Sequence, residues 1–85
     1  MSKYNWHISR KGEKPKVVRH YKWITMMFRF VLRNPAMFRG KEMTIYNHGK
    51  KVVDISWEQI VNLNSQGLKE GETRKIIKAL ESESE

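Results

Sequence analysis

The sequence predicts a small α+β domain, in which a short antiparallel sheet packs against a long amphipathic helix and one or two C-terminal helices. Three patterns support this fold class: a helical period over residues 17–33, a hairpin turn sequence at residues 47–50, and a capping-box spacing that begins at Ser56. Eighty-five residues are enough for a single domain. We expect this domain to span residues 1–80, with residues 81–85 as a disordered acidic tail.

The central segment, residues 17–33, carries the longest apolar-rich pattern in the chain, and its period is helical. At about 100° per residue its apolar side chains fall on one broad arc. Its basic stripe lies on the opposite side and consists of Arg19, Lys22, Arg29 and Arg33. A strand would mix charged and apolar side chains on both of its faces. Pro15 and Pro35 mark the limits of the helix, and Met37 and Phe38 should pack back against the core.

Two short patterns predict the strands of an antiparallel sheet. Residues 4–9 alternate between apolar and polar side chains, as in a strand with one apolar face, and a charged turn or loop should follow at residues 10–15. Asn47-His48-Gly49-Lys50 is a typical hairpin turn, because Asn and Gly tolerate the left-handed conformations that a tight turn requires. The hairpin strands are expected at about 42–47 and 50–56.

Two further helices are predicted after the hairpin. Ser56 and Gln59 have the spacing of a capping box, and Gly67 should end the helix that begins there. The last helix should run from Thr73 to about Glu81. These two helices resemble a helix-turn-helix only loosely, because the segment between them is longer than the usual turn. Negative charge at a helix C-terminus opposes the helix dipole, so the acidic tail should fray.

Several classes of function find no support in the composition. The chain has no cysteine, which excludes disulfides and thiolate metal sites. His7, His20 and His48 are spread over different predicted elements, and no catalytic or phosphate-loop signature occurs. We therefore expect no enzymatic activity, no metal and no cofactor. No apolar run reaches the roughly 20 residues that a membrane span needs, so we expect a soluble, cytoplasmic protein.

The net charge of +8 is concentrated in the first half of the chain. Residues 1–41 contain eleven Lys or Arg and one Glu, a net charge of +10, whereas residues 42–85 contain six Lys or Arg and eight acidic residues, a net charge of −2. The first half also contains seven of the nine aromatic residues. Cations interleaved with aromatic side chains are typical of surfaces that bind nucleic acid.

The basic stripe has no acidic neighbour between residues 14 and 41, so the pairing that usually supports a solvated helix is missing. We expect a partner to compensate, either a polyanion or an acidic protein surface. Trp23 and Phe30 border the stripe, where they could stack on bases or enter a partner's pocket, unless the sheet, the connector or a second subunit covers them. The candidate binding residues are Arg10, Lys11, Arg19, Lys22, Trp23, Arg29, Phe30 and Arg33.

Three functions remain open on this basis. The leading hypothesis is a small basic, non-enzymatic nucleic-acid-binding or regulatory protein that binds DNA or RNA through its N-terminal half. The alternative is a small inhibitor or adaptor that docks on an acidic surface of a partner protein, including one that itself handles nucleic acid. A third is a peripheral membrane-surface binder, although so short a chain needs the apolar arc for its core. A homodimer is compatible with each of them.

Overall fold

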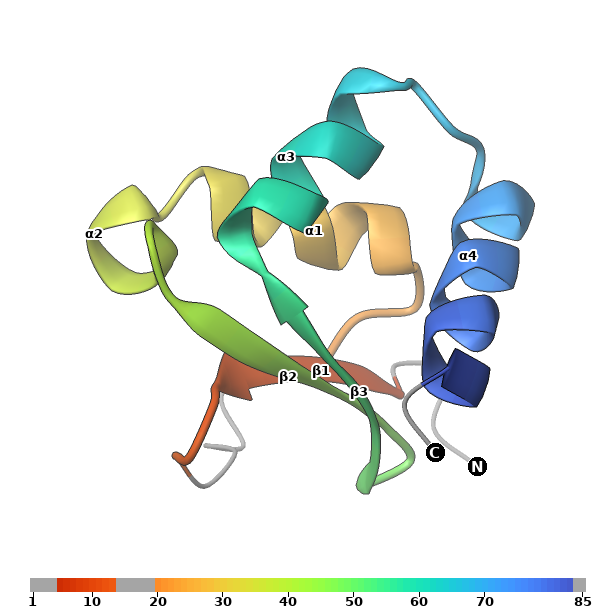
Figure 1. Cartoon of the computed structure of the whole chain (residues 1–85), viewed down its shortest axis with the longest axis horizontal. Coiled ribbons are helices and arrows are strands. Elements are labelled where there is room, and N and C mark those ends of the chain that lie inside the picture. Colours follow the sequence, from red (N-terminus) through yellow and green to blue (C-terminus); the bar gives the residue numbers. More distant parts are fainter. Residues whose placement is uncertain (1–4, 14–19, 84–85) are drawn as a thin grey trace.

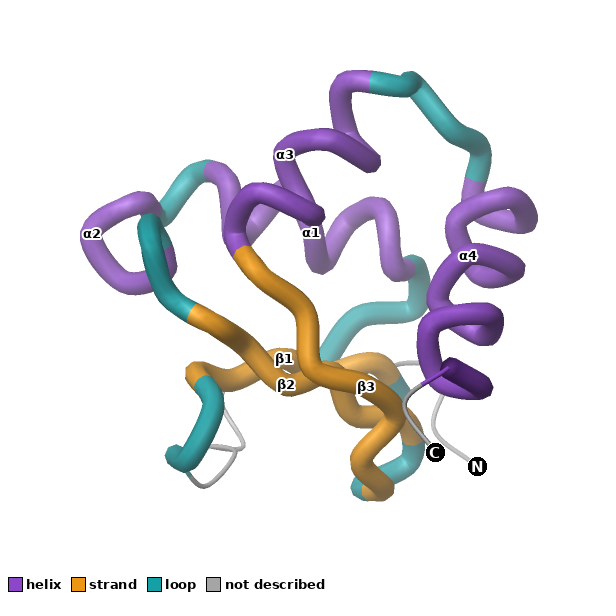
Figure 2. The backbone as a smooth tube through the Cα atoms, in the orientation of Figure 1, coloured by secondary structure: helices purple, strands orange, loops and turns teal. Residues whose placement is uncertain are grey.

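The computed structural model describes residues 5–13 and 20–83, and it confirms the predicted α+β class. The elements in chain order are β1 (Trp6–Arg10), α1 (Ile24–Leu32), α2 (Pro35–Phe38), β2 (Glu42–Asn47), β3 (Lys50–Ser56), α3 (Trp57–Ser65) and α4 (Glu70–Glu83). Figure 1 shows α1 and α3 above the sheet and α4 at its side, and Figure 2 traces the same path coloured by secondary structure.

The sheet is antiparallel and has the order β1-β2-β3. The hairpin strands β2 and β3 have the predicted bounds, because the turn between them holds the left-handed conformations that its sequence indicates. His48 has φ 52° and Gly49 has φ 78°. A two-residue hairpin turn requires such positive φ values for its backbone to match the right-handed twist of the two strands. The N-terminal strand β1 lies along the other side of β2, with Ile8 opposite Ile45.

The core lies between the apolar face of the sheet and the helices. Its sheet side includes Ile8, Ile45 and Ile55, and α1, α3 and α4 add buried side chains from above. The other sheet face is polar. There, Thr44 donates a hydrogen bond to the Asp54 carboxylate at 2.7 Å, and the His7 ring stacks on His20 with centroids 5.1 Å apart.

The central helix is shorter than predicted. It begins at Ile24 and not at Val17; residues 14–19 lie outside the described part of the chain, and residues 20–23 are not helical. Tyr21 instead pairs with Trp6 as an isolated antiparallel bridge, with N–H to O distances of 2.9 and 2.7 Å. His20, which falls within the predicted helix of residues 17–33, therefore lies before the observed helix. In the described residues 20–23, a tertiary backbone pairing therefore takes the place of the helical turn that the apolar period predicted.

The C-terminal helices start and end close to the predicted positions. The capping box is present: the Gln59 N–H donates to Ser56 Oγ at 3.2 Å, and the Ser56 N–H donates to Gln59 Oε1 at 2.8 Å. Helix α4 is longer at both ends than expected, since it begins at Glu70 and runs through Glu83. Residues 81–83 therefore continue α4 and do not form a separate tail, while residues 84–85 lie outside the described part.

The connector after α1 forms the short helix α2, which closes one end of the core. Phe38 is 2% exposed and contacts the Phe30 ring at a centroid distance of 5.9 Å. Met37, which we also expected to pack inward, is 44% exposed. A single turn of helix presents adjacent residues in different directions, so only one of this pair can face the core.

Candidate binding site

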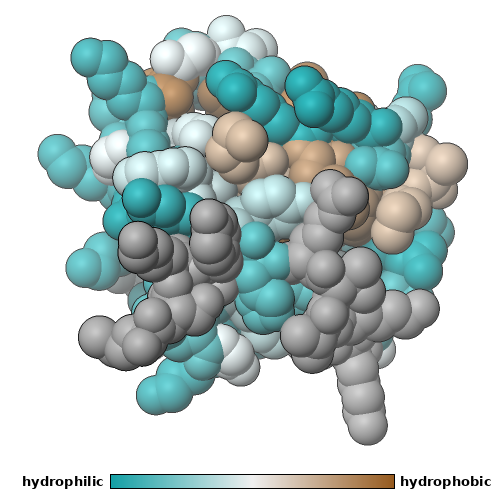
Figure 3. All heavy atoms as spheres, turned by 180° about the vertical axis from the view of Figure 1, so that it is seen from behind, coloured by the Kyte–Doolittle hydropathy of each residue, from teal (hydrophilic) through white to brown (hydrophobic). Residues whose placement is uncertain are grey.

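Helix α1 has one buried side and one exposed side. Ile24, Met27, Phe28 and Val31 are at most 3% exposed and pack into the core. The opposite side and the residues just before and after the helix are exposed, and we call this surface the α1 face: Lys22, Trp23, Met26, Arg29 and Arg33. Figure 3 views the molecule from behind, the side of α1, and shows tan apolar side chains next to teal polar ones.

The spacing of the residues explains why the α1 face combines charge with hydrocarbon. Met26, Arg29 and Arg33 follow one another in steps of three and four, so their side chains lie on one side of the helix. The rise from Arg29 to Arg33 is about 6 Å, close to the spacing of neighbouring phosphates. Trp23 and Met26 are 42% and 46% exposed, so the cations border an accessible apolar surface.

The cations of the α1 face form no ion pair with any carboxylate in the described residues. The Lys22 ammonium lies over the Trp23 ring, 4.9 Å from its centroid. The Arg29 guanidinium contacts the Met26 sulfur at 3.8 Å. Arg33 caps the helix through its backbone and is exposed. Three positive charges are therefore exposed, and none of them has a carboxylate partner within the part of the chain that the structure describes.

The first turn of α1 is capped by a side chain from α4. Both oxygens of the Glu70 carboxylate accept backbone hydrogen bonds at 2.9 Å, from the Ile24 N–H and from the Thr25 N–H. An anion at this position also interacts favourably with the positive end of the helix dipole. Burial alone would raise the pKa of Glu70, but the hydrogen bonds from Thr25, Ile24 and Arg74 outweigh burial and lower that pKa below its usual value.

Arg74 extends this cap to the α1 face. Its Nε donates a hydrogen bond to the Glu70 carboxylate at 2.9 Å, and its Nη2 donates one to the Lys22 carbonyl oxygen at 3.4 Å. The guanidinium also lies 5.6 Å from the centroid of the Trp23 ring and 6.0 Å from that of Trp6. Helix α4 therefore sets the position of the segment that leads into α1.

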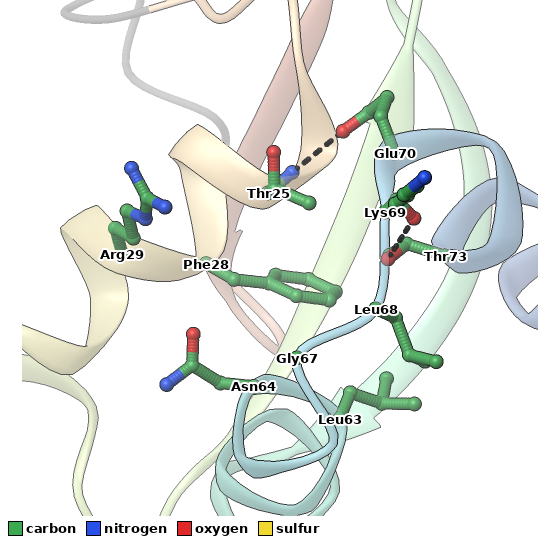
Figure 4. A pocket seen from close by; sticks show the side chains of 10 residues that line it. All are labelled: Thr25, Phe28, Arg29, Leu63, Asn64, Gly67, Leu68, Lys69, Glu70 and Thr73. Carbon is green, nitrogen blue, oxygen red and sulfur yellow. Dashed lines mark hydrogen bonds between the residues drawn. The ribbon is translucent and has the colours of Figure 1, made fainter.

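A pocket of about 420 Å³ opens between the start of α1, the end of α3 and the segment that joins α3 to α4. Figure 4 shows the side chains that line it. Phe28, Leu63 and Leu68 supply apolar walls, and the polar lining residues are Thr25, Arg29, Asn64, Lys69, Glu70 and Thr73. Arg29 thus belongs both to the α1 face and to this pocket.

The structure separates the eight predicted binding residues into groups. Lys22, Trp23, Arg29 and Arg33 are all exposed along the α1 face, with Lys22 and Trp23 just before the helix and Arg33 at its end. Arg10 and Lys11 lie at the end of β1 and just after it. Both form ion pairs: Arg10 pairs with Glu13, and Lys11 pairs with Glu42 at 3.1 Å and with Asp54 at 3.5 Å. Arg19 lies outside the described residues.

Phe30 does not lie on the α1 face. Its ring is half-buried between Tyr21, 5.8 Å away, and Phe38, 5.9 Å away. Phe38 belongs to the connector after α1, so the connector covers Phe30, as the alternative expectation stated. Trp23 is not covered in this way and is 42% exposed. Tyr21, in the segment that precedes the helix, thus helps to cover Phe30.

Four further residues that contribute to this region were missed: Met26, Asn64, Lys69 and Glu70. Met26 had a visible signal, because it lies three residues before Arg29 and seven before Arg33, within the basic stripe. The other three come from α3, α4 and the segment between them. No local pattern connects those residues to α1.

Within residues 5–13 and 20–83, no cluster of three His, Cys, Asp or Glu side chains is arranged to hold a metal ion. None of the described helices is long and apolar enough to cross a membrane. Comparison of the chain with known protein families, with curated proteins and with solved structures finds no match. The case for a function therefore depends on the geometry of the α1 face and the adjoining pocket.

Proposed function

We propose that this protein is a non-enzymatic nucleic-acid-binding protein that contacts phosphates through the α1 face. The observation that carries the proposal is the set of exposed cations, Lys22, Arg29 and Arg33, which meet no carboxylate among the described residues. In the described fold, ion pairs involve Arg10, Lys11, Lys51 and Arg74. Other exposed cations, such as Lys75 and Lys78, are also unpaired among the described residues, but the cations of the α1 face differ from them in bordering the exposed Trp23 and Met26. Charges left uncompensated on one surface attract a polyanion and release its counterions on binding.

The test is the salt dependence of binding. Affinities of fluorescently labelled duplex DNA, single-stranded DNA and RNA should be measured by anisotropy over a series of salt concentrations. The slope of log K against log salt is about −0.9 per neutralised phosphate on duplex DNA and about −0.7 on single strands. Replacing Lys22 and Arg33 by Gln should flatten this slope by about one to two units, because both side chains face solvent.

The matched control is the double variant Lys75→Gln/Lys78→Gln. It removes the same charge from the exposed side of α4, where these lysines also lack an ion pair among the described residues. The slope for the control should stay within experimental error of the parent. If both double variants flatten the slope equally, affinity depends on net charge alone, and the α1 face is not the binding surface.

The alternative is docking of the same face on an acidic protein surface. Trp23 and Met26 favour it, because they are 42% and 46% exposed, and Trp, Met and Arg are enriched at protein interfaces. This alternative requires a complex that survives nuclease treatment and is weakened more by Met26→Ala than by the loss of Lys22. A membrane-surface function is less favoured, since the apolar side of α1 is buried in the core.

A further inference from the structure

We infer that the pocket beside the α1 face binds one nucleotide unit of the nucleic acid, with the base against its apolar wall and the phosphate at its basic rim. This inference rests on the proposed function and adds to it a specific subsite. A pocket of about 420 Å³ lies within the range of about 300–1,000 Å³ that is usual for small-ligand sites. The lining residues divide into an apolar part and a charged part.

The apolar part comes from three elements that meet behind the opening. Phe28 of α1 is 3% exposed, and its ring lies at the centre of the view in Figure 4. Leu63 of α3 and Leu68, between α3 and α4, lie on the side toward which that ring points. Because Phe28 is almost fully buried, the accessible apolar surface comes mainly from the half-buried Leu63 and Leu68, and a flat, weakly polar group such as a nucleobase can replace water there.

The polar rim is suited to the rest of a nucleotide. Figure 4 shows Arg29 and Asn64 on one side of the Phe28 ring and Lys69 on the other. The Arg29 guanidinium can donate two parallel hydrogen bonds to a phosphate, and the Asn64 amide offers both a donor and an acceptor to the edge of a base. The pocket therefore offers phosphate donors and base-edge donors within one opening.

The charge balance of the rim favours an anion. Arg29 and Lys69 form no ion pair with the carboxylates of the described residues. Glu70 also lines the pocket, but both of its oxygens already accept hydrogen bonds from α1, and Arg74 pairs with it. Glu70 therefore does not cancel the two rim cations.

The position of Arg29 connects this subsite to the α1 face. Arg33 lies one turn further along the same side of the helix. A strand whose phosphates follow these two arginines brings one of its nucleotides to the opening of the pocket. Single-stranded nucleic acid fits this arrangement better than a duplex does, because its bases are free to leave the stack.

The test uses the full chain, labelled with ¹⁵N, and three probes: adenosine 5′-monophosphate, adenosine and inorganic phosphate. Adenosine 5′-monophosphate at millimolar concentration should give saturable shifts of the amide signals of residues 25–29 and 63–70. Lys69→Gln should weaken this binding about fivefold, a loss within the range of one exposed charge contact. The control is Lys78→Gln, on the exposed surface of α4, which should bind as the parent does.

Each outcome distinguishes the subsite from the proposed function. If oligonucleotides bind but adenosine 5′-monophosphate leaves residues 63–70 unshifted, the pocket assignment is wrong and the α1 face stands. If the mononucleotide shifts these residues while no oligonucleotide binds, the proposed function fails and the subsite stands. Equal affinity for inorganic phosphate and for the mononucleotide would overturn the assignment of the apolar wall to a base. Capture of an acidic peptide in place of the mononucleotide would overturn the assignment to a nucleotide altogether.

Discussion

The Glu70 carboxylate links α4 to the start of α1 through two backbone hydrogen bonds, so Glu70→Gln should destabilise the fold measurably. The substitution keeps the shape of the side chain but removes its charge. Gln has one acceptor oxygen, whereas the Glu70 carboxylate accepts from the Ile24 N–H, the Thr25 N–H and Arg74, each at 2.9 Å. At least one of these donors loses its partner in the variant.

The expected loss is about 1–2 kcal/mol of unfolding free energy at neutral pH. A hydrogen bond to a charged group contributes about 1.5–3 kcal/mol, and loss of a helix N-cap costs about 0.5–2 kcal/mol. We take the lower part of these ranges because the Glu70 side chain keeps 18% of its surface exposed, so water partly replaces the lost partner. For a chain of this length, the melting temperature should fall by about 4–16 °C.

Urea unfolding at several pH values provides the assay. The pKa of Glu70 is lower in the folded protein than its usual value of 4.5. Its contribution is therefore complete above the unfolded pKa and is lost as pH falls through the lower folded pKa. The difference in stability between the parent and Glu70→Gln should be constant from pH 7 to about 5.5 and should shrink at lower pH. Asp54, whose pKa is also lowered, titrates in both proteins and cancels in this difference.

The control for this experiment is Glu83→Gln near the end of the same helix, where the side chain is exposed. It should change the unfolding free energy by less than about 0.5 kcal/mol at any of these pH values. The reasoning is refuted if Glu70→Gln costs no more than this control at pH 7. It is also refuted if the cost of Glu70→Gln stays unchanged as the pH is lowered to 3.

Other substitutions test the packing and the local turns. Phe28→Ala should lower the free energy of unfolding, measured in urea, by about 3–5 kcal/mol because this ring is 3% exposed. Met26→Ala, on the exposed side of α1, should lower it by less than about 0.5 kcal/mol. Similar losses for the two variants would contradict the description of α1 as having one buried and one exposed side. Ser56→Ala should cost about 1 kcal/mol, measured in the same way, through loss of the capping box. Gly49→Ala should cost about 1–2 kcal/mol because φ is 78° there, and a neutral effect would show that the turn rearranges.

The elements that could be predicted from the sequence are those whose start or end is set by interactions between residues a few positions apart. The hairpin turn depends on the left-handed conformations of His48 and Gly49, and the start of α3 depends on Ser56 and Gln59, which are three residues apart. Such signals act before any tertiary contact forms. They therefore gave the bounds of β2, β3 and α3 correctly or nearly so.

The start of α1 could not be predicted in this way, because it is set by interactions with residues that are far away in the sequence. Glu70 caps Ile24 from 46 positions away, and Trp6 pairs with Tyr21 across the charged loop. The pattern at residues 21 and 22 is ambiguous, since a half-buried Tyr21 followed by an exposed Lys22 fits a helix and an extended segment equally well. The pocket was beyond prediction for the same reason, because its lining comes from residues 25–29 and 63–73.

Helix α1 has nine residues, and the two ends of its outer face differ in their dependence on the rest of the fold. At the start, the Lys22 carbonyl and the Trp23 ring both contact Arg74, which pairs with Glu70. A partner that displaces Trp23 must therefore also disturb the cap that stabilises the helix. Arg33, at the other end, donates its backbone N–H to α1 and has no ion pair among the described residues. Binding of a partner at Trp23 should therefore change the free energy of unfolding, whereas binding at Arg33 should leave it nearly unchanged.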